Sequence, residues 1–204
     1  MFEPINMDYS KTILKKAEDH VWVPSPHGEV LRCQLEREYS EIGWATSLVR
    51  YPVGASFHEH GHPGGEQFLV LEGFFSDHRG DFGVDTYVQN PVGYKHSPYS
   101  KNGCLIFVRL GALSRNAPMM AEKSIFNSSC MTIKTDDIDF LEARTLQSGE
   151  SITANAMEIF VVEGCLKHKE NSYNKHSWMR VAAKDHLQLT ATSSTKVVLR
   201  RLLR

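Results

Sequence analysis

The side chains best suited to chemistry lie in the segment Gly54–Gly73, where His60, His62 and Glu66 are separated by only a few residues. On a strand, alternate side chains share a face, so the two imidazoles can point at the same spot. Pro63-Gly64-Gly65 lets the chain bend, because glycine adopts conformations that other residues resist. We therefore expect His60, His62 and Glu66 to converge on one point.

A fourth polar side chain is expected from the following strand pair. His96 comes directly after the glycine-containing turn Pro91-Val92-Gly93. Three imidazoles and one carboxylate suit Zn, Fe(II), Mn, Ni or Cu, and suit Ca or Mg poorly. Each histidine must be neutral to bind, so affinity should fall as the pH drops below about 6–6.5. The sequence predicts one divalent metal ion, held by His60, His62, Glu66 and His96.

The alternative interpretation is that these side chains form a polar cluster at the mouth of a barrel and bind no ion. Buried imidazoles and a carboxylate without partners would be costly, which disfavours it. His58 has the same strand parity as His60 and His62 and could reach a metal or a substrate, but a position at the entrance or on the surface is preferred. No catalytic residue can be assigned.

The elements that must position these residues are short strands separated by Gly, Pro, Asn and Asp, which is typical of an all-β sandwich or barrel. Helical signal is scarce, and its best candidate is Ser10–Asp19, a short polar turn or helix. Residues 1–40 should otherwise supply an edge strand and an outer layer. The expected strands are Ala45–Tyr51, Gln67–Leu71, Thr86–Gln89, Leu105–Leu110, Ile159–Val162, Trp178–Ala182 and Lys196–Leu202.

An internal repeat suggests two copies of one barrel. One ungapped shift of 91 residues places Phe68–Gly73 on Ile159–Gly164 and Ile106–Arg109 on Val197–Arg200. The alternative is that any two β segments share apolar alternation. We expect residues 1–117 to form a metal-binding barrel and residues 118–204 to form a second barrel. The same shift places the four metal ligands on Ser151, Thr153, Met157 and Leu187, so the second barrel should lack the site.

Composition excludes several classes of protein. The 204 residues carry a formal net charge of −1 and contain no basic block, so no nucleic-acid partner is expected. No stretch approaches the roughly 20 apolar residues of a membrane span, and the N-terminus lacks the pattern of a secretory signal. The four cysteines are scattered and form no CxxC pair, which favours a reducing cytoplasm over a disulfide framework or thiolate zinc site.

The spacing G-x5-H-x-H-x3-E-x6-G, from Gly54 to Gly73, resembles the first motif of the cupin superfamily. A related pattern, G-x7-P-x-G-x2-H, runs from Gly83 to His96, with a longer first spacing than the commonest cupin motif. Cupins are jelly-roll-type β-barrels. The resemblance implies that the positions of His60, His62, Glu66 and His96 bind the metal, and that the chain is an all-β bicupin of two tandem barrels.

A narrower resemblance lies in Gly64–Gly73, Phe75–Asp77, Asp85–Pro91 and Gly103–Val108. These segments are similar to the cupin domain of ChrR-type anti-sigma factors and of related small oxygenases that cleave diketones. The ChrR cupin domain binds zinc and takes part in the response to singlet oxygen. The sigma-binding part of ChrR is a separate helical module with its own His and Cys ligands, which the first 40 residues here do not resemble.

Three functional hypotheses follow from this resemblance. The first is a regulatory or stress-sensing module closed around zinc, with Fe(II), Mn or Ni as other metals. The second is a metal-dependent oxygenase, of Fe(II) type, that cleaves a small dicarbonyl or phenolic compound held in the N-terminal barrel. The third, a sugar-binding cupin or isomerase, is disfavoured because no Lys, Arg or Asp set is placed to bind a sugar phosphate. Exposed strand edges lead us to expect a homodimer.

Overall fold

The computed structural model describes residues 2–40, 42–136 and 139–202 of the chain. The chain divides into two compact units. The N-terminal unit contains residues up to Met7 together with Val21–Ile125, and the C-terminal unit contains Asp8–His20 and the chain from Phe126 onward. These ranges differ from a simple division at residues 117 and 118, because the segment Asp8–His20 packs with the C-terminal unit.

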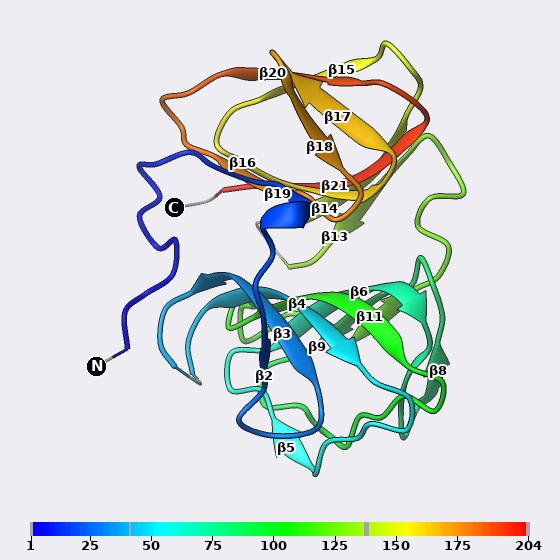
Figure 1. The fold of residues 1–204 in the computed structure, drawn as a ribbon. Coiled ribbons are helices and arrows are strands. Elements are labelled where there is room, and N and C mark those ends of the chain that lie inside the picture. The colour runs from blue at the N-terminus through cyan, green and yellow to red at the C-terminus, as the bar shows by residue number, and fades with distance from the viewer. Residues whose placement is uncertain (1, 41, 137–138, 203–204) are drawn as a thin grey trace. The chain divides into compact units, whose positions relative to one another are not determined.

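The N-terminal unit contains eleven short strands, drawn in Figure 1. Their bounds are β2 Trp22–Pro24, β3 Leu31–Arg37, β4 Ala45–Tyr51, β5 His60–Gly61, β6 Glu66–Gly73, β7 Phe75–Asp77, β8 Gly80–Phe82, β9 Tyr87–Asn90, β10 Lys95–His96, β11 Cys104–Leu110 and β12 Met120–Glu122. Seven of them form one antiparallel sheet in the order β12-β9-β6-β11-β4-β3-β2, and β5-β10 and β7-β8 form two-stranded sheets.

The core of the N-terminal unit lies between the large sheet and the small ones. One buried apolar cluster joins Phe68 and Val70 of β6 to Phe75 of β7 and Phe82 of β8. Strand β6 is buried from Glu66 to Leu71, so both of its faces are covered. This agrees with its almost unbroken run of apolar residues, since a half-exposed strand would alternate apolar with polar residues.

The C-terminal unit is built from the remaining strands and one 3₁₀ turn, η1 Ala17–Asp19. The strands are β1 Ile13–Lys15, β13 Cys130–Lys134, β14 Phe140–Leu146, β15 Ser151–Ala154, β16 Met157–Glu163, β17 Cys165–His168, β18 Asn171–Asn174, β19 Trp178–Val181, β20 Leu187–Ala191 and β21 Thr195–Arg201. Six form a sheet in the order β1-β19-β16-β21-β14-β13, and four form a second sheet in the order β15-β20-β17-β18.

The two units repeat one strand order. In the large sheets, β9-β6-β11-β4-β3 corresponds to β19-β16-β21-β14-β13. Strands β9 and β19, and likewise β11 and β21, have identical bounds after the shift of 91 residues. The register of β6 against β11 shifts at Leu71, and that of β16 against β21 shifts at the corresponding Val162. The repeat read from the sequence therefore extends to strand pairing and to a β-bulge.

Two sequence-based expectations need correction. The stretch Ser10–Asp19 is not a helix: it contains strand β1 and the single turn η1. Ile13 and Leu14 pair with Arg180 and Met179 of β19, a partner that lies far away in the sequence. The sheets are also open rather than closed barrels, because each ends in edge strands and the layers meet through side chains. All seven expected strands are present, and the fold is all-β.

Candidate metal centre

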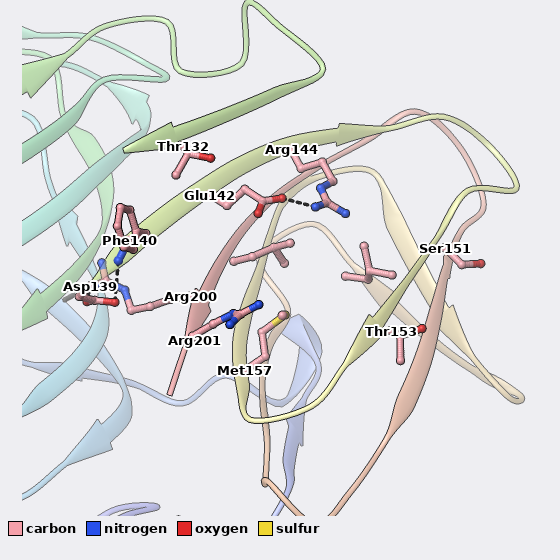
Figure 2. Close-up of a pocket in the computed structure, with 12 residues that line it drawn as sticks. Thr132, Asp139, Phe140, Glu142, Arg144, Ser151, Thr153, Met157, Arg200 and Arg201 are labelled. Atoms are coloured by element: carbon pink, nitrogen blue, oxygen red, sulfur yellow. Dashed lines mark hydrogen bonds and ion pairs between the residues drawn. The ribbon is translucent and has the colours of Figure 1, made fainter. Parts of the chain in front are cut away.

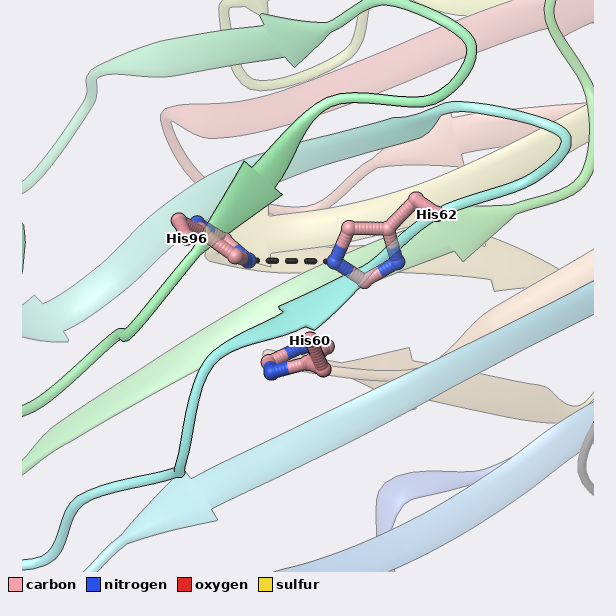
Figure 3. Close-up of side chains that lie close together, drawn as sticks. All are labelled: His60, His62 and His96. Atoms are coloured by element: carbon pink, nitrogen blue, oxygen red, sulfur yellow. Dashed lines mark hydrogen bonds between the residues drawn. The ribbon is translucent and has the colours of Figure 1, made fainter.

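Three strands bring the four sequence-predicted ligands together. Strands β5 and β10 pair so that His60 lies directly opposite His96. His62 follows β5 and precedes the turn that leads to Glu66, the first residue of β6. Figure 3 shows the three imidazole rings turned toward one another. One ligand atom from each of His60, His62 and His96 lies within 4.8 Å of the others, close enough to hold a metal ion.

Glu66 lies beside two of these histidines. Its Oε2 atom lies 3.6 Å from Nε2 of His62 and 3.6 Å from Nε2 of His96. The two imidazole nitrogens are themselves 3.0 Å apart. A tetrahedral zinc ion with bonds of about 2.05 Å separates its ligand atoms by about 3.3 Å. The observed separations of 3.0 Å and 3.6 Å lie a few tenths of an ångström on either side of that value.

The outer nitrogens of two histidines fix which atoms face the centre. Nδ1 of His60 lies 3.0 Å from the backbone carbonyl oxygen of His58, so it must donate a proton. Nδ1 of His96 lies 3.4 Å from Oδ2 of Asp77, to which it can also donate. Both arrangements leave an Nε2 lone pair directed inward, the usual preparation of a metal-binding histidine. Two such lone pairs repel one another unless a proton or a cation lies between them.

The electrostatics of the site favour neutral imidazole beside carboxylate. Burial lowers the pKa of His62, as do His96 and His60, against the opposing effect of Glu66. Burial alone would raise the pKa of Glu66, but His62, His96 and a hydrogen bond from Asn90 outweigh it, and the net pKa is lowered. A neutral imidazole and an ionised carboxylate are the forms that bind metal.

A hydrogen-bonded network behind the ligands links His96 to Glu66 through Arg79. The guanidinium of Arg79 contacts both carboxylate oxygens of Asp77, at 2.8 Å for the shortest contact, and donates to Oδ1 of Asn90 at 2.7 Å. Asn90 in turn donates to Oε2 of Glu66 at 2.7 Å. His96 and Glu66 are thereby each held by a polar neighbour that Arg79 orients.

The surroundings of Asp77 favour its ionised form. Burial would raise the pKa of its carboxyl, but hydrogen bonds from His96 and Arg79 hold it well below its usual range. Arg79 is itself fixed, because its guanidinium lies over the rings of Tyr94 and Phe82. Sequence reasoning assigned no role to Asp77, Arg79 or Asn90, although Asp77 and Asn90 lie in the segments that carry the narrower resemblance.

Aromatic rings flank the side of the centre nearest to His60. The ring of Phe57 lies 5.4 Å from that of His60, and Tyr51 contacts both Phe57 and Phe75. Burial and then the charge of Glu66 raise the pKa of the Tyr51 phenol, which keeps it protonated. His60 is only partly buried, whereas His96 is 2% exposed, so solvent approaches from the His60 side.

The turn before Glu66 needs its glycines for two different reasons. Gly65 has φ of +74°, which favours glycine. At Gly64 the obstacle is space, since a Cβ would lie 2.5 Å from the Cα of Gly111. The carbonyl oxygen of His62 accepts backbone hydrogen bonds from Gly65 and Gly93, which ties the two ligand-bearing turns together.

Other histidines and the second unit stand apart from this centre. The side chain of His58 is exposed, and its contribution is the carbonyl oxygen that holds His60. In the C-terminal unit Ser151 and Thr153 are exposed, while Met157 and Leu187 pack against the apolar core. Among the residues that the structure describes, the histidine triad is the one cluster of His, Cys, Asp and Glu with metal-binding spacing.

An all-β fold that brings three histidines and a glutamate together at the ends of short strands is that of the cupin class. The model of the ChrR cupin-like domain family matches residues 10–114, which is 105 of the 204 residues. The chain belongs to this family. The narrower resemblance seen in the sequence is thereby confirmed.

Solved structures share the fold over nearly the whole chain. Protein YlbA from Escherichia coli has a TM-score of 0.72 at 13% identity, covering 97% of this chain and 93% of its own. Bacterial pirin YhhW from E. coli, solved with nickel(II), has a TM-score of 0.69 at 15% identity, covering 94% and 99%.

A putative dioxygenase from Nostoc punctiforme PCC 73102 has a TM-score of 0.63 at 11% identity, covering 98% and 83%. No protein of curated function matches the sequence significantly. Among the described residues, no helix has the length and hydropathy that crossing a membrane requires.

Proposed function

We propose that the chain is a bicupin whose N-terminal unit binds one divalent metal ion, zinc in the first place, and works as a regulatory or stress-sensing module. The observation that carries this proposal is the triad of His60, His62 and His96, with Oε2 of Glu66 3.6 Å from Nε2 of both His62 and His96. If all four donors bind, they would make a closed, four-coordinate set. Closed sets of this kind are typical of structural zinc, which binds tightly and leaves no position for a substrate.

The support for zinc is the chemistry of the donors. Imidazole nitrogen and carboxylate oxygen are common zinc ligands, and the separations of 3.0 Å and 3.6 Å are near the about 3.3 Å between ligands of a tetrahedral zinc. The family supports the regulatory role, since it is named for the cupin domain of ChrR. Nickel or iron would also accept these donors, and the pirin neighbour was solved with nickel(II).

The C-terminal unit would be the structural copy of the bicupin. It repeats the strand order and the β-bulge of the N-terminal unit. At the positions of the four ligands it has Ser151, Thr153, Met157 and Leu187, which are poor partners for a borderline divalent ion.

A second candidate function is a metal-dependent dioxygenase of Fe(II) type that cleaves a small dicarbonyl or phenolic compound. The observation in its favour is the partly exposed His60, flanked by the rings of Phe57 and Tyr51. Aromatic side chains beside a metal are suited to a small planar substrate. A metal bound there would act as Lewis acid and template, while Asp77 and Asn90 would orient its ligands.

Elemental analysis separates the two candidates when it is paired with an activity measurement. Protein purified without added metal should contain about one zinc per chain, and the iron-loaded protein should consume no oxygen with a panel of β-diketones and phenols. The His96→Ala variant should lose the metal, whereas His168→Ala, in the C-terminal unit, should keep it. Metal retained in full by His96→Ala would refute the site, and oxygen uptake that His96→Ala abolishes would favour the dioxygenase.

A further inference from the structure

The C-terminal unit contains a cavity of about 540 Å³, shown in Figure 2. This volume is within the range of small-molecule sites. Five strands contribute to its lining: β13, β14, β15, β16 and β21. The cavity lies wholly within the C-terminal unit, so it shares no residue with the metal centre.

The register places this cavity at the strand ends that correspond to the metal centre. Met157 pairs with Arg201, and in the N-terminal unit Glu66 pairs with Leu110 at the same two positions after the shift of 91 residues. The ligand carboxylate is thus replaced by a thioether, and an apolar neighbour is replaced by a guanidinium. The cavity therefore lies at the position that corresponds to the metal centre. Its side chains carry a positive charge, whereas those of the metal centre suit a cation.

Two of the three arginines that line the cavity form ion pairs with acidic residues of the lining. Asp139 and Arg200 form an ion pair with 2.5 Å between Oδ2 and the guanidinium nitrogen. Glu142 and Arg144 form a second ion pair, drawn in Figure 2. Arg201 also lines the cavity, and among the described residues it has no acidic partner. The described charged residues of the lining therefore sum to one positive charge.

Apolar side chains supply the other half of the lining. Ile152 and Leu199 belong to the buried core of the C-terminal unit, and Met157 packs against it. Hydroxyl groups at the rim come from Thr132 and Thr153. A guanidinium beside an apolar floor suits a ligand with one carboxylate and an aliphatic body, because the planar fork of arginine binds both oxygens of a carboxylate.

We propose that this cavity is a second binding site, for a small monocarboxylate with an apolar tail, and that Arg201 holds the carboxylate. The tail would lie against Met157, Ile152 and Leu199. This proposal is independent of the metal centre and of the function proposed for it.

A titration with hexanoate as the probe tests the site. The protein is labelled with ¹³C in the methionine methyl groups, and the Met157 signal is assigned with a Met157→Leu variant. Hexanoate should shift the Met157 signal in a saturable way, and hexanamide, the neutral isostere, should not. This comparison needs no arginine variant, so it stands even where a variant folds poorly.

Arg201→Gln should weaken hexanoate binding by about tenfold or more, because a charge-assisted hydrogen bond is lost. Lys184→Gln, which removes an exposed cation elsewhere in the same unit, should leave binding unchanged. An unshifted Met157 signal, equal shifts with hexanoate and hexanamide, or unchanged binding in Arg201→Gln would each overturn the proposal. Hexanoate bound directly to a metal would leave Met157 unshifted, so that outcome also counts against this site.

Discussion

Asp77 offers the sharpest test of how the metal centre is held. Its carboxylate lies 3.4 Å from Nδ1 of His96, which donates a proton to it, and it forms an ion pair with Arg79. Asp77→Asn keeps the shape and removes the charge, and its amide could present an N–H to the imidazole. Nε2 of His96 would then be less basic and less strictly directed at the metal. The variant should bind metal more weakly while the fold persists.

The size of the effect follows from the geometry. Changes of this kind in outer residues cost about 10- to 100-fold in metal affinity. The 3.4 Å separation between His96 Nδ1 and Asp77 Oδ2 lies beyond the usual length of a hydrogen bond. We therefore expect the lower end of that range, about tenfold, or about 1.4 kcal/mol.

Competition with a chromophoric chelator measures this affinity, and circular dichroism reports whether the variant is folded. Asp81→Asn is the matched control. Asp81 is an exposed carboxylate that accepts a hydrogen bond from the hydroxyl of Ser76. A folded Asp77→Asn protein with the affinity of the wild type would refute the reasoning, as would an equal loss in Asp81→Asn.

Three other outcomes are expected. Glu66→Gln should lower metal affinity by more than about tenfold in the chelator assay. Glu72→Gln, at a partly exposed position further along the same strand, should not; equal effects of the two substitutions would contradict this. Gly64→Ala should lower the free energy of unfolding by about 1–3 kcal/mol in urea, because its methyl would lie 2.5 Å from backbone. Gly61→Ala, whose methyl would meet nothing nearer than the flexible side chain of Lys95 at 3.4 Å, should lose less. Metal affinity should decrease as the pH is lowered, because protonated imidazoles cannot bind metal. The lowered pKa of His62 keeps this residue neutral to a lower pH than a free imidazole. A dissociation constant that does not change between pH 5 and 7, about the range in which free imidazole titrates, would contradict this expectation.

Local sequence patterns predicted the individual strands and turns correctly where neighbouring residues determine the conformation. Strand β6 could be predicted because its run of apolar residues is continuous. The turn before it could be predicted because only glycine fits at Gly64 and Gly65. The stretch Ser10–Asp19 was predicted as a turn or helix; it contains the turn η1, and strand β1 was missed. Its strand exists through pairing with Arg180 and Met179, and no local pattern encodes a partner so far away.

The candidate site divides in the same way. His60, His62 and Glu66 were found because they lie on one short segment with strand periodicity. Asp77 and Asn90 come from two further strands, and only the folded chain shows that Arg79 bridges them. Their sequence signal is weak: Asp77 is a buried acidic residue at the end of a short strand, which becomes meaningful once its partner is known.

Anomalous diffraction at the zinc edge, from crystals of protein purified without added metal, tests the central claim most directly. We predict one peak per chain, at about 2.0–2.2 Å from a nitrogen of His60, His62 and His96 and from an oxygen of Glu66. A peak at any other place, or a map in which these four side chains diverge with no peak between them, would contradict the account.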